Sequence, residues 1–237
     1  KLTTSQIQKL GTGQISALTT AQIQGLTTAQ VVAIETSDVA KLTTAQIGAL
    51  TEDQVAKMTT AQIQALTTQQ IAAIETTDIS KLTSAQVLAL TTAQVSAVTT
   101  QQLTNLTTDQ IKSIETLDLQ QLTTAQVAAF TNAQVQALTT AQVVALTTAQ
   151  FAALNTNEVS KLTTAQIAAI ETDDIKALST AAVRAIDATA LTTDQIASLS
   201  SDVVSSLSVN DSQLAYLTVA QVAAMSSDQI KAIESRD

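Results

Sequence analysis

Apolar residues recur at every eighth position along most of the chain. A second apolar residue follows each of them five positions later, from Ile7 to Val183. The typical unit reads L-T-T-A-Q-I-x-A, and we call this eight-residue unit the octad. The first apolar series is Leu2, Leu10, Leu18, Leu26, Ile34, Leu42, Leu50, Met58, Leu66 and Ile74, and it continues in the same register to Ile186.

A period of eight does not suit a continuous α-helix. At 100° per residue, the apolar stripe would rotate by about 80° with each octad. A supercoiled helix needs a repeat of 7 or 11 residues instead. The pattern therefore predicts a helix that is interrupted and restarted, once per octad or once per two octads.

Each octad contains a signal for a helix start. Thr139 and Gln142 have the spacing of a capping box, in which the Thr side chain and the Gln side chain each bond to the other residue's backbone N–H. Leu138 and Val143 flank them at the positions of a hydrophobic staple. The octad at Leu42 has the same four roles, with Leu42 and Ile47 as the staple and Thr43 and Gln46 as the caps.

The pattern predicts an all-α solenoid, right- or left-handed, with one very short helix per octad. Such a helix is unstable alone, but stacked neighbours would bury both apolar series in one core. The alternative is a β-solenoid, because Thr, Val and Ile favour strands. The odd spacing of five would place the two apolar residues on opposite faces of a strand. The chain also has only four glycines for tight corners, so we favour the helical fold.

Some octads replace the Thr and the Gln by acids. Four of them begin at Ile34, Ile74, Ile114 and Leu154, which lie forty residues apart. Because both cap positions change together, we infer that they contact each other. The pairs are Glu35/Asp38, Glu75/Asp78, Glu115/Asp118 and Glu171/Asp174, with a weaker version at Asn155/Glu158.

We expect the cap in these acidic octads to shift to Thr36, with Asp38 in the first turn, where a carboxylate complements the helix dipole. Five octads per superhelical turn would stack the acidic octads in a column, and we favour that number. The simplest role for the acids is solubility; contacts between neighbouring rods are another. A third is Ca²⁺ binding, with candidate ligands Glu35, Asp38, Glu75, Asp78, Glu115, Asp118, Glu171 and Asp174.

Composition argues against most chemical functions. The chain has no Cys and no His, so it lacks disulfides, thiolates and the commonest general base and metal ligand. A net charge of −9 disfavours nucleic-acid binding, and no apolar run is long enough for membrane insertion. No phosphate loop, zinc spacing or nucleophile motif is present. We therefore expect no enzymatic activity and no cofactor.

Several single residues have simple structural interpretations. Phe130 and Phe151 occupy apolar ladder positions and are expected in the core, and Tyr216 is a third large residue near a ladder. Four lysines end their octads, three or four residues after an acid, which predicts local ion pairs. They are Lys41, Lys57, Lys81 and Lys161, after Asp38, Asp53, Asp78 and Glu158.

The register divides the chain into two parts. Residues 1–186 form a regular octad array with a forty-residue super-period, and residues 187–237 continue it irregularly. The breaks lie near 187–190 and 208–216, and they indicate tolerated insertions and deletions or a hinge. Neither end shows a polar capping repeat, which predicts that the array belongs to a longer protein.

The strings LTTAQI, LTTAQV, LTTDQI and IETTDI resemble repetitive segments of very large secreted or surface proteins of Gram-negative bacteria, of the adhesin and haemolysin type. The glycine-rich calcium nonapeptides of haemolysins are absent. The resemblance implies an extracellular or cell-surface location, with self-association or neighbouring domains as partners. We expect a spacer, stalk or self-assembling surface element, with a protein- or glycan-binding adhesin solenoid and an ice-binding Thr array as alternatives.

Overall fold

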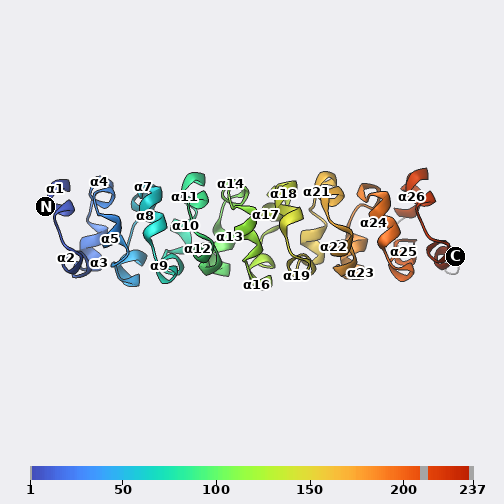
Figure 1. The fold of residues 1–237 in the computed structure, drawn as a ribbon, viewed down its shortest axis with the longest axis horizontal. Helices are drawn as coiled ribbons and strands as arrows, with labels where there is room; N and C mark the ends of the chain where they lie inside the picture. Colours follow the sequence, from blue (N-terminus) through green and yellow to red (C-terminus); the bar gives the residue numbers. More distant parts are fainter. Residues whose placement is uncertain (1, 209–212, 235–237) are drawn as a thin grey trace. The chain divides into compact units, whose positions relative to one another are not determined.

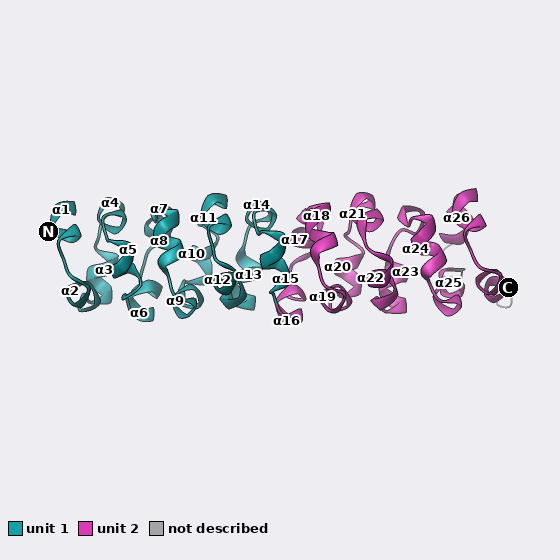
Figure 2. Ribbon diagram, viewed as in Figure 1, with its two compact units in different colours: residues 1–122 teal, residues 123–237 magenta. Residues whose placement is uncertain are grey.

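The described part of the chain folds into a succession of short helices (Figure 1). The computed structural model describes residues 2–208 and 213–234, and within these ranges it contains α-helices and two 3₁₀ helices but no strand. The all-α solenoid is confirmed and the β-solenoid is wrong. The helices form two compact units, residues 1–122 and residues 123–237 (Figure 2).

The first unit contains fifteen helices among its described residues. They are α1 (Thr4–Gln8), α2 (Thr12–Ser16), α3 (Thr20–Gln24), α4 (Thr28–Val32), α5 (Thr36–Val39), α6 (Thr44–Gly48), α7 (Glu52–Lys57), α8 (Thr60–Ala65), α9 (Thr68–Ala73), α10 (Thr76–Ile79), α11 (Ser84–Leu88), α12 (Thr92–Ala97), α13 (Thr100–Asn105), α14 (Thr108–Lys112) and α15 (Thr116–Gln120).

The second unit continues with α-helices and includes the two 3₁₀ helices, labelled η. They are α16 (Thr124–Val127), α17 (Asn132–Ala137), α18 (Thr140–Ala145), α19 (Thr148–Ala152), α20 (Thr156–Val159), α21 (Thr164–Ala169), α22 (Thr172–Ala177), α23 (Thr180–Ala185), η1 (Ala188–Ala190), α24 (Thr193–Ser198), α25 (Ser201–Ser208), η2 (Gln213–Tyr216), α26 (Val219–Ala223) and α27 (Ser227–Glu234).

Each helix ends at the next apolar ladder residue or one or two residues before it. Leu66, after α8, has φ −63° and ψ 140°, and Thr67 is also extended, with φ −73° and ψ 162°. The chain thus leaves the helical conformation for two residues and re-enters it at Thr68. As expected, there is one helix per octad, and each is too short to persist without tertiary packing.

Within each unit, a helix packs against the helix three octads further along. In the first unit, α5 contacts α2 and α8, and α10 contacts α7 and α13. The expectation of five octads per turn is therefore wrong, and the acidic octads forty residues apart do not stack in a column. The acidic octads recur every forty residues in the sequence, but this interval is not the number of residues in one turn of the solenoid. The length of a turn depends on how the helices pack.

Both apolar series form the core. Ile63, Ile71 and Val135, which follow the Gln of their octads, have no exposed surface, and Leu66 and Leu138 are 4% exposed. Phe130 and Phe151 are also buried, as expected, whereas Tyr216 is 71% exposed and lies outside the core. None of the helices in the described part of the chain has the length and apolarity needed to cross a membrane.

Candidate functional site

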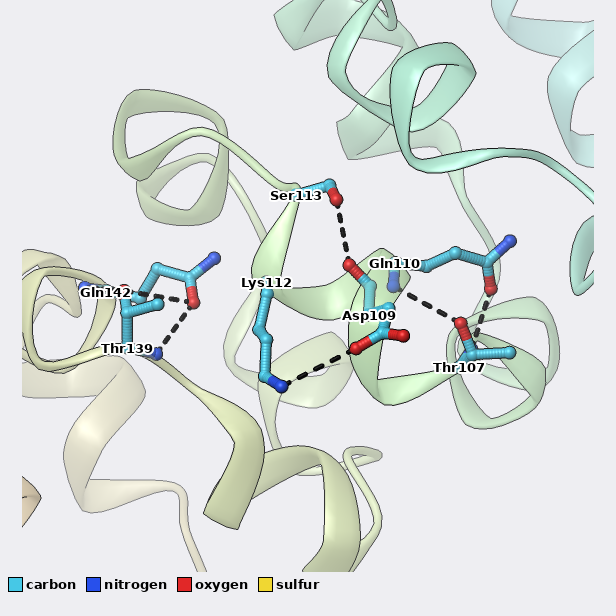
Figure 3. Close-up of polar contacts among 7 residues, drawn as sticks. All are labelled: Thr107, Asp109, Gln110, Lys112, Ser113, Thr139 and Gln142. Atoms are coloured by element: carbon cyan, nitrogen blue, oxygen red, sulfur yellow. Dashed lines mark hydrogen bonds and ion pairs between the residues drawn. The ribbon is translucent and has the colours of Figure 1, made fainter.

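The predicted capping box is present in the octads that carry Thr and Gln. In Figure 3, the backbone N–H of Gln110 donates to the Thr107 Oγ1 at 3.2 Å, and the Thr107 N–H donates to the Gln110 Oε1 at 2.7 Å. Thr139 and Gln142 form the same pair of bonds, at 3.1 and 2.9 Å. The Thr43 and Gln46 caps are confirmed in the same way. In each, two unpaired N–H groups at the helix start gain acceptors.

The same Gln has a second role that the capping box does not predict. The Gln110 Nε2 donates to the carbonyl oxygens of Ile79, at 2.9 Å, and Leu82, at 2.7 Å. These residues lie 31 and 28 positions earlier, in the preceding turn of the solenoid. We call this set of bonds from one Gln to the preceding turn a rung.

Rungs recur through both units, and up to Gln166 those within a unit have the same spacing. A helix contacts the helix three octads before it, and its Gln reaches the junction between the third and fourth, so one turn takes between three and four octads. Rungs within the units start from Gln30, Gln46, Gln54, Gln62, Gln70, Gln86, Gln94, Gln102, Gln110, Gln166, Gln195, Gln221 and Gln229.

Glutamine is the residue that can fill both roles. Its Oε1 accepts the N–H of the cap residue while its Nε2 donates to the carbonyls of the preceding turn. The carbonyl of Leu82 needs that donor, because Leu82 lies between two helices and accepts no backbone hydrogen bond among the described residues. Glu could accept but not donate, and Asn is one methylene shorter. Gln110 is itself buried, so each lost bond would leave a buried polar group unpaired.

Rungs also persist where the octad register breaks. After the short five-residue unit that holds η1, Gln195 bonds to Ile167 and Ile170, which lie 28 and 25 residues earlier, both at 2.7 Å. Gln221, after the ten-residue spacing, bonds to Ala188 and Leu191, 33 and 30 residues earlier. The second predicted break falls partly on residues 209–212, which lie outside the described residues. A rung therefore still forms after each break, although the number of residues between its Gln and the carbonyls changes.

The four Glu/Asp octads lack both the capping box and the rung. The predicted calcium candidates lie at the starts of α5, α10, α15 and α22, where the cap residue is Glu and makes no side-chain cap hydrogen bond. The expected shift of the cap to Thr36 is wrong, because the cap residue of α5 is Glu35 and Thr36 is already helical. Asp38 does lie in the first turn, as expected, and it is buried.

The octad with Asn155 and Glu158 differs from the other acidic octads. The Asn155 N–H donates to the Glu158 Oε2 at 2.8 Å, and the Asn155 Nδ2 donates to the Glu158 Oε1 at 2.7 Å. Asn155 in turn accepts hydrogen bonds from the N–H groups of Asn157 and Glu158. Here the paired change of the two positions does reflect contact, and Glu158 keeps the capping function without a rung.

The carboxyl of Asp78 has a raised pKa. Burial raises the pKa of its carboxyl, a hydrogen bond from Thr77 lowers it, and the carboxylates of Glu52 and Glu75 raise it further. The net effect is a pKa above the ordinary value for an Asp carboxyl. Burial likewise raises the pKa of Glu158, against the lowering effect of its hydrogen bonds from Asn155.

The lysine pairings differ from those expected. Lys81 pairs with Glu52, at 3.2 Å, and not with Asp78. Lys41, Lys57 and Lys161 form no ion pair with any acid in the described part of the chain. The local pairs that do form use acids at the second helical position, as between Lys112 and Asp109 at 3.5 Å (Figure 3). Across residues 2–208 and 213–234, no three His, Cys, Asp or Glu side chains gather into a metal-binding group.

A family model of the ALTTAQ repeat matches residues 1–28, 31–68, 71–108, 111–148 and 167–209, which is most of the chain. The chain belongs to the ALTTAQ repeat family. The ALTTAQ matches that begin at residues 31, 71 and 111 are forty residues apart, so the family unit has the same super-period as the acidic octads.

Two further comparisons add little to the ALTTAQ assignment. No curated protein matches the sequence. Among solved structures, the leucine-rich repeat-containing protein LegL7 from Legionella pneumophila is similar over 98% of this chain and 88% of its own, at 8% identity and a TM-score of 0.27.

Proposed function

We propose that this ALTTAQ array is a non-catalytic structural element, a spacer or stalk of a secreted or cell-surface protein. The observation that carries the proposal is the locality of its contacts. Each helix packs on the helix three octads away, and each rung spans one turn. Octads can therefore be added or removed without changing the remaining contacts, so the length of such an array can be set by the number of repeats.

The surface of the array supports a mechanical role. In the octad at Leu138, both Thr residues and the following Ala are exposed, while Gln142 and Val143 are buried. The neighbouring glutamine octads repeat this pattern. Their surface is uncharged and nearly the same from one turn to the next, which suits lateral self-association or a plain spacer better than recognition of one partner. The extracellular location rests on the resemblance of the LTTAQI and LTTDQI strings to secreted repeat segments.

Length variants test the spacer. Deleting residues 35–74 joins Ile34 to Glu75 and keeps the octad register, and duplicating the same forty residues adds five octads. Fluorophores at the two ends of the chain would report the end-to-end distance of each variant. We expect the deletion to shorten and the duplication to lengthen this distance by equal amounts, with cooperative helical unfolding preserved in both.

The spacer proposal would be contradicted if the deletion unfolded the chain, or if the end-to-end distance did not change with the number of octads. Sedimentation velocity of the full chain tests self-association separately. Specific binding to a glycan array or to one host protein, unchanged in the length variants, would favour an adhesin instead.

A further inference from the structure

The helices α22 and α23 of the second unit have no rungs to the turn before them. The rung Gln is the third residue of its helix, and this place is taken by Asp174 in α22 and by Ala182 in α23. An ionised Asp and an Ala have no side-chain donor. A Gln at these two places would reach Leu146 and Leu154, 28 residues earlier, and the oxygens of both accept no hydrogen bond among the described residues.

The turn that follows α22 and α23 also links to them weakly. Val203 is the third residue of α25 and has no side-chain donor. The rung of Gln195 ends at Ile170, before α22 begins. Gln213 makes one bond to α23, from its Nε2 to the carbonyl oxygen of Arg184 at 3.2 Å. In the described part of this turn, no Gln therefore makes a full rung to α22 or α23.

A cavity lies beside α23 as well. Its volume is about 310 Å³, and its lining includes Ala181 and Ala185 of α23 and Leu207 of α25. Gln213 also lines it, and the buried Oε1 of this side chain has no hydrogen-bond partner among the described residues. Atoms that line a cavity lose packing contacts, and a buried unpaired oxygen costs desolvation energy. The cavity therefore weakens the packing of α23 further.

The helices α8 and α9 of the first unit provide a matched comparison. Each has 6 residues, as α22 and α23 do. Gln62 and Gln70 connect α8 and α9 to the preceding turn by full rungs. Gln94 and Gln102 connect the following turn to them in the same way. The two helix pairs have equal lengths, but only α8 and α9 are linked by rungs on both sides.

Backbone bonding and burial are otherwise the same in the two pairs. The N–H groups of Ile175 and Val183 donate to the carbonyl four residues earlier, at 3.1 and 3.0 Å. Those of Ile63 and Ile71 do so at 3.0 and 2.9 Å. Each of these four side chains is at most 1% exposed. Because such short helices do not persist alone, the links between turns determine how often each pair opens.

We propose that residues 171–186, which contain α22 and α23, form an opening segment. It detaches from the neighbouring turns and rebinds reversibly while the helices that carry rungs stay folded. The missing rungs and the cavity lower the free-energy cost of this local opening. Pulled straight, the segment spans roughly 55 Å. A spacer under load would lengthen at this place first; that consequence rests on the proposed spacer role, whereas the opening itself does not.

Backbone amide hydrogen exchange of the full chain tests the opening segment. In the wild type, we expect the N–H groups of Ile175 and Val183 to exchange faster than those of Ile63 and Ile71. Relative to the intrinsic rate of each amide, the difference should be at least about tenfold. Helix length, local bonding and burial are matched in the two pairs, so a difference of this size reports the links between turns.

Two variants change the rungs in opposite directions. E171T/D174Q/A182Q supplies a cap hydroxyl and two rung glutamines to the opening segment. We expect it to slow the exchange of Ile175 and Val183 by about tenfold, without changing α8 and α9. Q62A/Q70A removes rungs from α8 and α9 and should speed the exchange of both helices. Q64A, at an exposed position of α8, is the control and should change neither pair.

Equal exchange of the two helix pairs in the wild type would overturn the proposal. Fast exchange that persists in a folded E171T/D174Q/A182Q would also overturn it, because the opening would then not depend on the missing rungs. If circular dichroism shows that this variant does not fold, Q62A/Q70A decides: unchanged exchange of α8 and α9 would contradict the proposal. None of these outcomes bears on the spacer, which the length variants test.

Discussion

The glutamine octads and the Glu/Asp octads share the eight-residue spacing, the apolar staple and one short helix each, but they join successive turns differently. In a glutamine octad, the side-chain amide of the Gln is buried. Its oxygen accepts a hydrogen bond from the N–H of the cap residue, and its nitrogen donates to two carbonyl oxygens of the preceding turn. In an Asp octad, the helix begins without a side-chain cap and the facing carbonyl has no protein donor among the described residues. Backbone geometry and apolar packing therefore suffice to form an octad, and the Gln adds the link between turns.

Removing one rung should have the largest effect. Gln94→Ala leaves the buried carbonyl of Leu66 without a partner and removes the acceptor of the Thr91 N–H. At about 1–3 kcal/mol for each unpaired group, we expect a loss of roughly 3 kcal/mol in the free energy of unfolding. Urea unfolding followed by circular dichroism measures it.

The matched control is Gln64→Ala. Gln64 is an exposed glutamine in the neighbouring helix α8, where substitution by Ala should change stability by less than about 0.5 kcal/mol. Equal losses in the two variants would show that the rung contributes nothing specific.

Adding a rung to an acidic octad should have the opposite sign. E75T/D78Q supplies a cap hydroxyl and an amide for the carbonyls of Ile47 and Leu50, which lie 31 and 28 residues earlier. A cap and two hydrogen bonds, at about 1 kcal/mol each, predict a gain of roughly 2 kcal/mol. Asp109→Gln, at an exposed position of a glutamine octad, is the control and should give no such gain. A loss of stability in E75T/D78Q would contradict the prediction that Thr and Gln can form a cap and a rung in an acidic octad.

Removing a cap hydroxyl tests the part of the comparison that stays within one octad. Thr91→Ala deletes the acceptor of the Gln94 N–H but leaves the rung in place, so we expect a loss of about 1 kcal/mol. Thr92→Ala, at the next and exposed position, should be neutral or slightly stabilising, because Ala has the higher helix propensity. If Thr91→Ala cost as much as Gln94→Ala, the rung would add nothing to the cap.

The smallest effect concerns pH. Because the pKa of Asp78 is raised in the folded state, its ionisation costs stability above that raised pKa and costs nothing below the pKa of the unfolded chain. Asp78→Asn should therefore be more stable than the wild type at pH 7, with the difference in stability shrinking as the pH falls toward the ordinary pKa range for Asp. Asp53→Asn, at an exposed first-turn position, should show no gain. Thermal midpoints from pH 7 to pH 3.5 measure both, and a difference that grows on acidification would contradict the direction of the pKa shift.

The local part of the structure could be predicted from the sequence, and the long-range part could not. The four roles of Leu138, Thr139, Gln142 and Val143 lie within six residues, so the capping box and staple determine the helix start by themselves. The rung and the number of octads per turn depend on the path of the whole superhelix. One signal was present: a capping box accepts Glu or Gln, yet this position is Gln in most octads and Glu only at residue 158, which indicates a requirement for a donor.

The most direct test of the rungs is the exchange of side-chain amide hydrogens in the full chain labelled with ¹⁵N-glutamine. Gln46, Gln94 and Gln110 are buried and donate to the preceding turn, whereas Gln24, in α3, and Gln64, in α8, are exposed. We predict that the amide hydrogens of the three buried glutamines exchange with water at least about tenfold more slowly than those of the two exposed ones. Equal exchange in both groups would contradict the claim that glutamine links the turns of this array.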